Sequence, residues 1–179
     1  MAPYRATVLI RDAVPADAPR CAEVYAPYVT DAAVSFELEP PSAAEMAARI
    51  ARAQEGHAWL VAERDDRVVG YAYGGEWMTR AAYRWSCTVS VYLEPGLRRT
   101  GTGRALYEAL FTRLAARGHR TALAGITLPN PASEGLHRAL GFEPVGTFRR
   151  VGFKDGSWHD VAWWQRPLTG DDGPPAALR

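Results

Sequence analysis

Two glycines spaced two residues apart, Gly101 and Gly103, stand where a run of strand-forming residues gives way to a helical pattern. Glycine lets the backbone approach a ligand closely, and a helix N-terminus presents free N–H groups with a partial positive charge. Arg98, Arg99 and Arg104 place further positive charge around this turn. These residue types in this order predict a site for a pyrophosphate.

Several classes of phosphate site contain such a turn, and their glycine patterns differ. The dinucleotide fingerprint GxGxxG would need glycine where Leu106 stands, and a P-loop would need Gly-Lys-Ser/Thr, which the chain lacks. The remaining pattern is Arg-x-x-Gly-x-Gly (98–103) after Val-Tyr-Leu-x-Pro (91–95), which resembles the GNAT superfamily of acetyl-CoA-dependent transferases. The alternative is a helix that merely begins with turn glycines.

The elements that must position this turn can be predicted from periodicity and turn residues. We expect strands at 6–11, 58–64, 67–77, 85–93, 121–127, 142–153 and 158–168. Helices are expected from about 14, from a capping box at Ser42 and Glu45, over 98–118, and after Asn130-Pro131. The order is βααβββαβαββ, with a parallel crossover between 85–93 and 121–127. We assign residues 1–168 to one domain and 169–179 to a disordered tail.

Composition narrows the functional classes. The 179 residues suit one domain, and a net charge of +1 gives no general field for nucleic acid. Cys21 and Cys87 have no metal-ligand spacing, so no metal site is expected. There is no signal-peptide pattern and no apolar run of about 20 residues. We therefore expect a cytoplasmic protein with no membrane partner.

The GNAT resemblance implies an α/β (α+β) fold: a mixed central sheet with splayed parallel strands, flanked by helices. It also implies acetyl-CoA as cofactor, with pantetheine in the gap between the splayed strands and the pyrophosphate on the glycine turn. Asn130 is also an ordinary helix N-cap, so its cofactor role has a structural alternative. The residues implied in cofactor binding are Tyr92, Leu93, Arg98, Arg99, Thr100, Gly101, Thr102, Gly103, Arg104, Asn130 and Ser133.

Within this superfamily the chain resembles the phosphinothricin N-acetyltransferase family over about residues 8 to 168. That family acetylates the α-amine of phosphinothricin and of related methionine sulfone or sulfoximine compounds. The matching segments are VSFELEP (34–40), WLVAE (59–63), GYAY (70–73), AYRW (82–85), SVYL (90–93), RRTGTG (98–103), LHRALGF (136–142) and VGFKDGSWHDVAWWQ (151–165).

The resemblance implies His137 as the catalytic histidine, since imidazole can act as acid or base near neutral pH. Thr88 occupies a position where the family usually carries a carboxylate. Threonine can orient a water molecule but cannot hold a proton near pH 7. Deprotonation of the amine would then depend on His137 alone, on a chain of water molecules, or on Glu37 or Glu39.

A substrate pocket is also implied by the resemblance, and Arg80 would clamp an anionic group in it. Family members often have a basic residue near the position of Met78, and an apolar side chain there favours a less anionic substrate. For each residue the alternative is an ordinary core or surface role. The implied substrate residues are Phe36, Arg80, Tyr83, Ser90, Tyr92 and Val161.

Three functions follow. The first is an N-acetyltransferase for an amino-acid-like amine, with a detoxification or resistance role. The second is an acetyltransferase for another small amine or antibiotic, and the third is a non-catalytic acetyl-CoA-binding protein. The family tends to form homodimers with its late strands near both active sites, so a homodimer is expected, with a monomer that has a tryptophan-rich core as the alternative.

Overall fold

The computed structural model describes residues 8–97, 99–170 and 173–178, and its strands form one seven-stranded sheet in the order β1-β2-β3-β4-β5-β7-β6. Neighbouring strands are antiparallel except β4 and β5, which are parallel. The strands are β1 Leu9–Asp12, β2 Trp59–Arg64, β3 Arg67–Glu76, β4 Ser86–Leu93, β5 Thr121–Thr127, β6 Glu143–Lys154 and β7 Ser157–Pro167. The helices are α1 Ala18–Thr30, α2 Ala43–Gly56, α3 Thr102–Ala116 and α4 Pro131–Ala139.

This order is the predicted βααβββαβαββ, with a parallel β4–β5 crossover through α3, so both predictions are confirmed. The capping residues explain several boundaries. The Ser42 hydroxyl accepts a hydrogen bond from the Glu45 amide at the start of α2, and Asp65 and Asp66 adopt positive φ in the tight β2–β3 turn.

One boundary was wrong. Helix α3 begins at Thr102, four residues later than expected, because Gly101 at its N-cap has a left-handed conformation with φ of 83°. The helix ends as predicted, because Gly118 at φ 100° donates to the Ala115 carbonyl.

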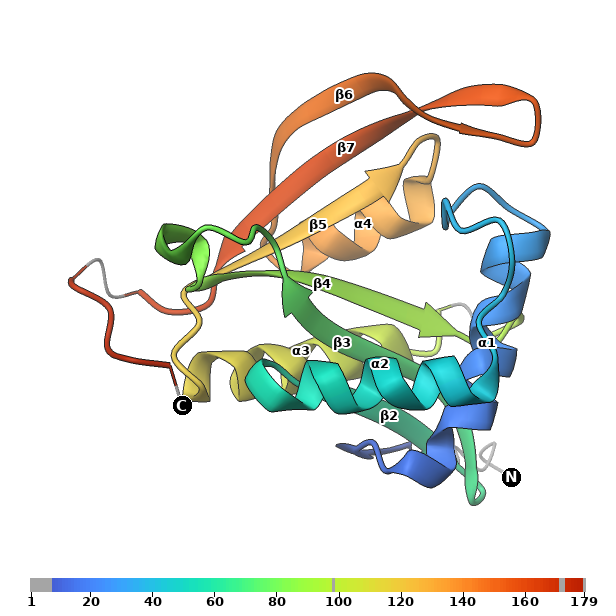
Figure 1. Ribbon diagram of the computed structural model, residues 1–179, viewed down its shortest axis with the longest axis horizontal. Helices are drawn as coiled ribbons and strands as arrows, with labels where there is room; N and C mark the ends of the chain where they lie inside the picture. Colours follow the sequence, from blue (N-terminus) through green and yellow to red (C-terminus); the bar gives the residue numbers. More distant parts are fainter. Residues whose placement is uncertain (1–7, 98, 171–172, 179) are drawn as a thin grey trace, which may run out of the picture.

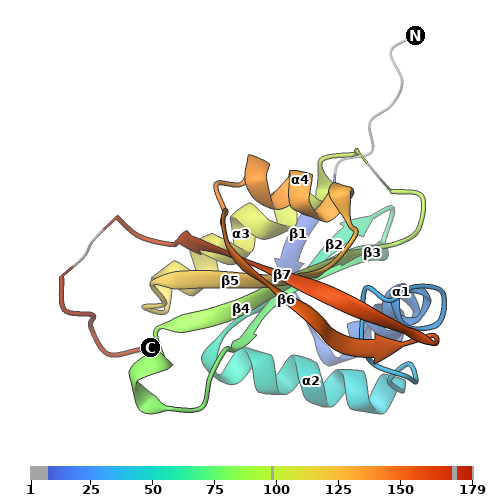
Figure 2. The ribbon, with the colours of Figure 1, turned by 90° about the horizontal axis from the view of Figure 1, so that it is seen from above.

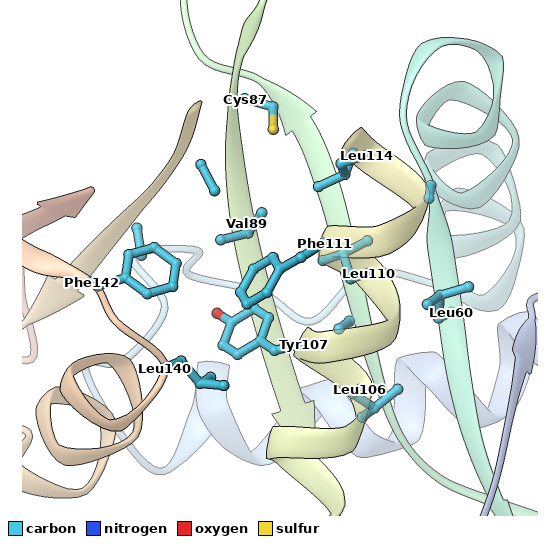
Figure 3. Packing of buried hydrophobic residues seen from close by; sticks show 14 of the residues in the cluster. Leu60, Cys87, Val89, Leu106, Tyr107, Leu110, Phe111, Leu114, Leu140 and Phe142 are labelled. Carbon is cyan, nitrogen blue, oxygen red and sulfur yellow. The ribbon is translucent and has the colours of Figure 1, made fainter. Parts of the chain in front are cut away.

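Helices cover both faces of the sheet: α3 and α4 lie on one side, and α1 and α2 lie on the other (Figure 2). Each face has its own apolar core. On the α3 side, buried side chains of the sheet pack on Leu106, Leu110 and Leu114 (Figure 3). On the α1–α2 side, Met46 and Ile50 pack on residues of β2 and β3.

The far end of the β6–β7 hairpin is attached to the α1–α2 connection by Lys154, the only lysine in the chain. Its ammonium is buried and donates to the backbone carbonyls of Val29, Ala32 and Ser35, at 2.6, 3.0 and 2.8 Å. Figure 1 shows this hairpin reaching across the sheet toward α1. The lysine therefore joins two segments more than 100 residues apart.

The described residues near the C-terminus also contact the domain. The Trp85 indole N–H donates to the Ala176 carbonyl at 2.9 Å. The disorder of 169–179 stays a prediction. Among the described residues, no helix has the length and apolarity needed to cross a membrane, and the cytoplasmic location likewise stays a prediction.

Replacing Lys154 by Met should lower the free energy of unfolding by about 3 kcal/mol, because buried carbonyls lose a charged donor. Chemical denaturation would measure this loss. Arg149→Met is the matched control. The Arg149 side chain is 81% exposed and makes a long ion pair of 3.6 Å with Asp160, so its loss should change stability little. Equal stability losses in the two variants would contradict the anchoring role.

Candidate active site

The central feature of the site is the separation of β4 from β5. The two strands pair through only three residue pairs, from Ser86↔Thr121 to Thr88↔Leu123. Beyond them β4 stays paired with β3 as far as Leu93, and β5 stays paired with β7 as far as Thr127. The strands diverge in Figure 1, as the predicted splay requires.

A cavity of about 60 Å³ occupies this gap. It contains five of the predicted site residues, which come from β4, the start of α4 and the body of α4. Its lining is Val34, Val89, Ser90, Val91, Tyr92, Tyr107, Ala124, Gly125, Ile126, Thr127, Asn130, Ser133 and His137. The structure therefore brings Ser90, Tyr92, Asn130, Ser133 and His137 together around one cavity, and their roles stay predictions.

His137 is almost fully buried in α4 and has defined partners on both ring nitrogens. Nδ1 lies 2.8 Å from the Ser133 carbonyl oxygen, and since a carbonyl only accepts, Nδ1 carries the proton. Nε2 then accepts the hydrogen bond of the Tyr107 hydroxyl at 3.1 Å. Burial lowers the pKa of His137, so the imidazole is neutral at neutral pH.

Tyr107 is the residue that sequence reasoning missed. It lies on the apolar stripe of α3, where an aromatic side chain reads as core, and it does stack on Phe111 at 5.3 Å (Figure 3). Its burial raises its pKa well above the ordinary value. Its hydroxyl nevertheless points toward His137 on α4. The position of Tyr107, one turn after the glycine turn, was the sequence feature that could have indicated a role in the site.

The glycine turn lies at the end of β4, outside the cavity lining. Gly96, Arg99 and Gly101 all have positive φ, and a Cβ added at Gly101 would meet no atom within 4 Å. Ala105 donates the first full-turn α3 bond, to Gly101, so the amides of Gly103 and Arg104 precede the hydrogen-bonded turns. Open space in front of a helix N-terminus fits an anionic diphosphate.

The other predicted cofactor residues have mixed surroundings. Thr100 and Thr102 hydroxyls bond each other at 2.9 Å inside the turn. The Arg104 side chain is engaged by Glu108 and by the Ala139 carbonyl, and Arg99 is exposed. Arg98 lies outside the described residues.

Leu93 was expected to offer its backbone to pantetheine, but the Tyr28 hydroxyl already contacts it. That hydroxyl donates to the Leu93 carbonyl at 2.7 Å and lies 3.3 Å from the Leu93 amide. Strand alternation turns the backbone groups of Val91 the same way, into the gap. The backbone of Val91 therefore also faces the gap, at a position that sequence reasoning did not single out.

Thr88 and the remaining predicted substrate residues lie outside the gap cavity. The Thr88 hydroxyl is 3.3 Å from the Gly75 carbonyl, at the last pair before the splay. Between β3 and β4, Arg80 is the N-cap of the short 3-10 helix Ala81–Tyr83, and Tyr83 is its last residue. Phe36 comes from the α1–α2 connection and lies 6.0 Å from the His159 ring, and Val161 pairs with Thr127.

Glu37, one of the alternative acids, is engaged by other groups. Its carboxylate accepts hydrogen bonds from Arg49 at 2.7 and 2.9 Å and from the Tyr25 hydroxyl at 2.8 Å. The bonds from Arg49 in particular hold the pKa of Glu37 below its ordinary value, although partial burial opposes them. A carboxylate stabilised in this way is a weak base.

We expect neutral His137 to be the Nδ1–H tautomer with a pKa below the ordinary histidine value, and Tyr107→Phe to raise that pKa. The variant removes the hydrogen bond that only the neutral Nε2 accepts, so protonation becomes easier. Long-range proton–nitrogen NMR spectra across a pH series would measure both quantities. Tyr83→Phe, an exposed tyrosine outside the cavity, is the control; an Nε2–H tautomer in the parent protein would contradict the assignment.

The chain matches known proteins along most of its length. The family model "Acetyltransferase (GNAT) domain" matches residues 10–163. A phosphinothricin N-acetyltransferase of Streptomyces viridochromogenes is 40% identical over 179 residues, covering 100% of this chain and 97% of the relative. An L-methionine sulfoximine/L-methionine sulfone acetyltransferase of Pseudomonas paraeruginosa is 37% identical, covering 89% of this chain and 94% of the relative.

A solved structure agrees. The phosphinothricin acetyltransferase of Sinorhizobium meliloti, crystallised in complex with AcCoA, superposes with a TM-score of 0.90 at 41% identity, covering 95% of this chain and 94% of the other. The fold, the splayed strands and these likenesses together confirm the predicted family. The chain belongs to the phosphinothricin N-acetyltransferase family of the GNAT superfamily.

Proposed function

We propose that this protein transfers the acetyl group of acetyl-CoA to the primary amine of a small amino-acid-like compound, as a detoxification or resistance enzyme. The amine class is that of its relatives, which are named for phosphinothricin and for methionine sulfoximine or sulfone. The observation that carries the proposal is the gap between β4 and β5, which joins a glycine turn to a cavity containing His137.

The residues present fit acetyl-CoA. The open space at Gly101 and the first amides of α3 would hold the diphosphate, while the Val91 backbone and Asn130 would contact the pantetheine arm. Asn130 Oδ1 also accepts from the Ser133 amide at 3.1 Å, so its role as helix N-cap coexists with that contact. When bound, acetyl-CoA supplies a thioester that an amine can attack.

The chain's own residues would move the protons. His137 Nε2 is the neutral nitrogen at the gap, and the hydroxyl of Tyr107 bonded to it can pass a proton between that nitrogen and the cavity. Thr88, with its hydroxyl on the Gly75 carbonyl, can orient a water molecule toward the incoming amine. Glu37 is excluded as an effective base by its bonds to Arg49 and Tyr25.

A second candidate is an acetyltransferase for a different small amine. Thr88 supports it, because the family's usual carboxylate is absent there, and Met78 supports it as an exposed apolar side chain. The two candidates share the cofactor site and differ only in the acceptor.

Gly101→Ala should weaken acetyl-CoA binding about tenfold, because the new Cβ would stand before the α3 amides. Gly141→Ala is the matched control. Gly141 has a similar φ of 78° and equally open surroundings, but it lies just after the C-terminal end of α4, away from the α3 amides. Calorimetry would measure both dissociation constants. Equal affinity for the two variants would refute the assigned turn.

Release of free CoA thiol from acetyl-CoA, measured with a panel of amines, distinguishes the three candidate functions. Turnover of methionine sulfone or phosphinothricin supports the first candidate, and turnover of other amines alone supports the second. Tight acetyl-CoA binding without turnover of any amine would leave a non-catalytic binding protein.

The proposed assembly is a homodimer through β6, the edge strand of the sheet. Its apolar side chains are exposed, with Phe148 at 61% and Phe153 at 58%, and Trp158 on β7 is 53% exposed. Exposed apolar patches of this kind mark interaction surfaces. Trp164, by contrast, is buried in the core, so only Trp158 of these two tryptophans is available to the proposed interface.

Phe148→Asp combined with Phe153→Asp should convert the dimer to a monomer, because charge would be buried in an apolar contact. Analytical ultracentrifugation would show the change in mass. Leu9→Asp is the control, since Leu9 is 55% exposed on β1, at the opposite edge of the sheet. A monomeric parent protein would contradict the proposal.

A further inference from the structure

A second cavity, of about 300 Å³, lies between α2 and the strands β2 and β3, and the proposed reaction does not yet use it. It is on the α1–α2 face of the sheet, where Thr88 and Tyr92 also point. Its lining is Tyr25, Met46, Arg49, Arg52, Ala53, His57, Trp59, Tyr71, Tyr73, Gly74, Gly75 and Glu76. For scale, a buried apolar cavity of about 150 Å³ is large enough to take up benzene.

The floor of this cavity is a group of aromatic rings on β2 and β3 that ends at Tyr73, one position before Gly75 on the same face of β3. The ring centroid of Trp59 on β2 lies 4.9 Å from that of Tyr71 and 4.4 Å from that of Tyr73, with planes within about 15°, and the two tyrosine centroids on β3 are 6.3 Å apart. Side chains two residues apart on a strand share a face, so Gly75 is the next position in the row. Gly75 has no side chain, which leaves room for another ring beyond Tyr73.

The space above Gly75 is open for a structural reason. A Cβ added at Gly74 would lie 2.9 Å from Leu114 of α3, so Gly74 faces α3 and Gly75 faces α2. A Cβ added at Gly75 would meet only the Thr88 hydroxyl, at 3.5 Å. The slot therefore adjoins Thr88, and Thr88 is the last residue of β4 paired with β5 before the gap.

The charges around the slot favour a neutral occupant. The Arg49 guanidinium is bound by the carboxylates of Glu37 and Glu45. Burial lowers the pKa of His57 to about 4, so this ring is uncharged at neutral pH, and it stacks on His119 at 4.7 Å. Arg52 and Glu76 are exposed and have opposite charges.

We infer that the slot above Gly75 binds a flat aromatic side chain of the acceptor, so that the enzyme acetylates primary amines bearing an aromatic ring, such as aromatic α-amino acids. The ring would extend the row of Tyr71 and Tyr73 along β3, while the amine reaches the gap past Thr88. Stacking on Tyr73 would add to the burial of the ring. This inference rests on the proposed acetyl transfer and specifies its acceptor.

The test compares kcat/KM for L-phenylalanine and methionine sulfone in the parent protein and in Gly75→Phe. The variant places the protein's own ring in the slot, so kcat/KM for phenylalanine should fall about tenfold or more, while that for methionine sulfone should fall less. Gly170→Phe, the same change at an exposed position with no atom within 4 Å of the added Cβ, should preserve both values.

Gly75→Ala serves as a second variant that the fold accommodates, with a smaller loss expected in the same direction. Acetyl-CoA binding by calorimetry confirms that each variant is folded. Turnover of methionine sulfone without turnover of phenylalanine, or equal losses for both acceptors in Gly75→Phe, would overturn the inference and leave acetyl transfer intact. Absence of turnover with every amine would instead overturn the proposed function itself.

Discussion

The early end of pairing between β4 and β5 is the constraint on which the rest of the structure depends. Two parallel strands at the centre of a sheet would ordinarily satisfy each other's backbone along their whole length. Here they stop at Thr88 and Leu123, so polar backbone groups face a gap. A ligand that runs along β4 can form hydrogen bonds with these groups as a strand would. Pairing of β4 with β3 and of β5 with β7 holds the two strands in place on either side of the gap.

The elements around the gap supply its chemistry from both faces of the sheet. From one face, α3 brings the glycine turn and Tyr107, and α4 brings Asn130 and His137. From the other face, α1 brings Tyr28 to Leu93, and the α1–α2 connection brings Val34 to the cavity. The buried ammonium of Lys154 donates to the Ser35 carbonyl, next to Val34, and so attaches that connection to the β6–β7 hairpin.

The fold and much of the site could be predicted because they depend on local patterns. The glycines after β4, the Asn130-Pro131 helix start and the alternation in β4 each leave a short signature. Ser90, Ser133 and His137, which the family resemblance implied, do line the gap cavity. Tyr107 was missed although it lies one turn after the glycine turn, because an aromatic side chain on the apolar stripe of α3 predicts only a core residue. The contact between Tyr28 and Leu93 spans 65 residues and leaves no periodic trace. The start of α3 was missed because the left-handed Gly101 delays the helix.

Lys154 has a consequence beyond the position of the hairpin. All the other side chains counted as Lys or Arg in this protein are arginines. The lone lysine residue is 4% exposed, and its ε-amine has three backbone carbonyls as partners. Acyl thioesters modify free amines, and a guanidinium is not one. A protein that handles an activated acyl donor thus displays no lysine on its own exterior for that donor to modify.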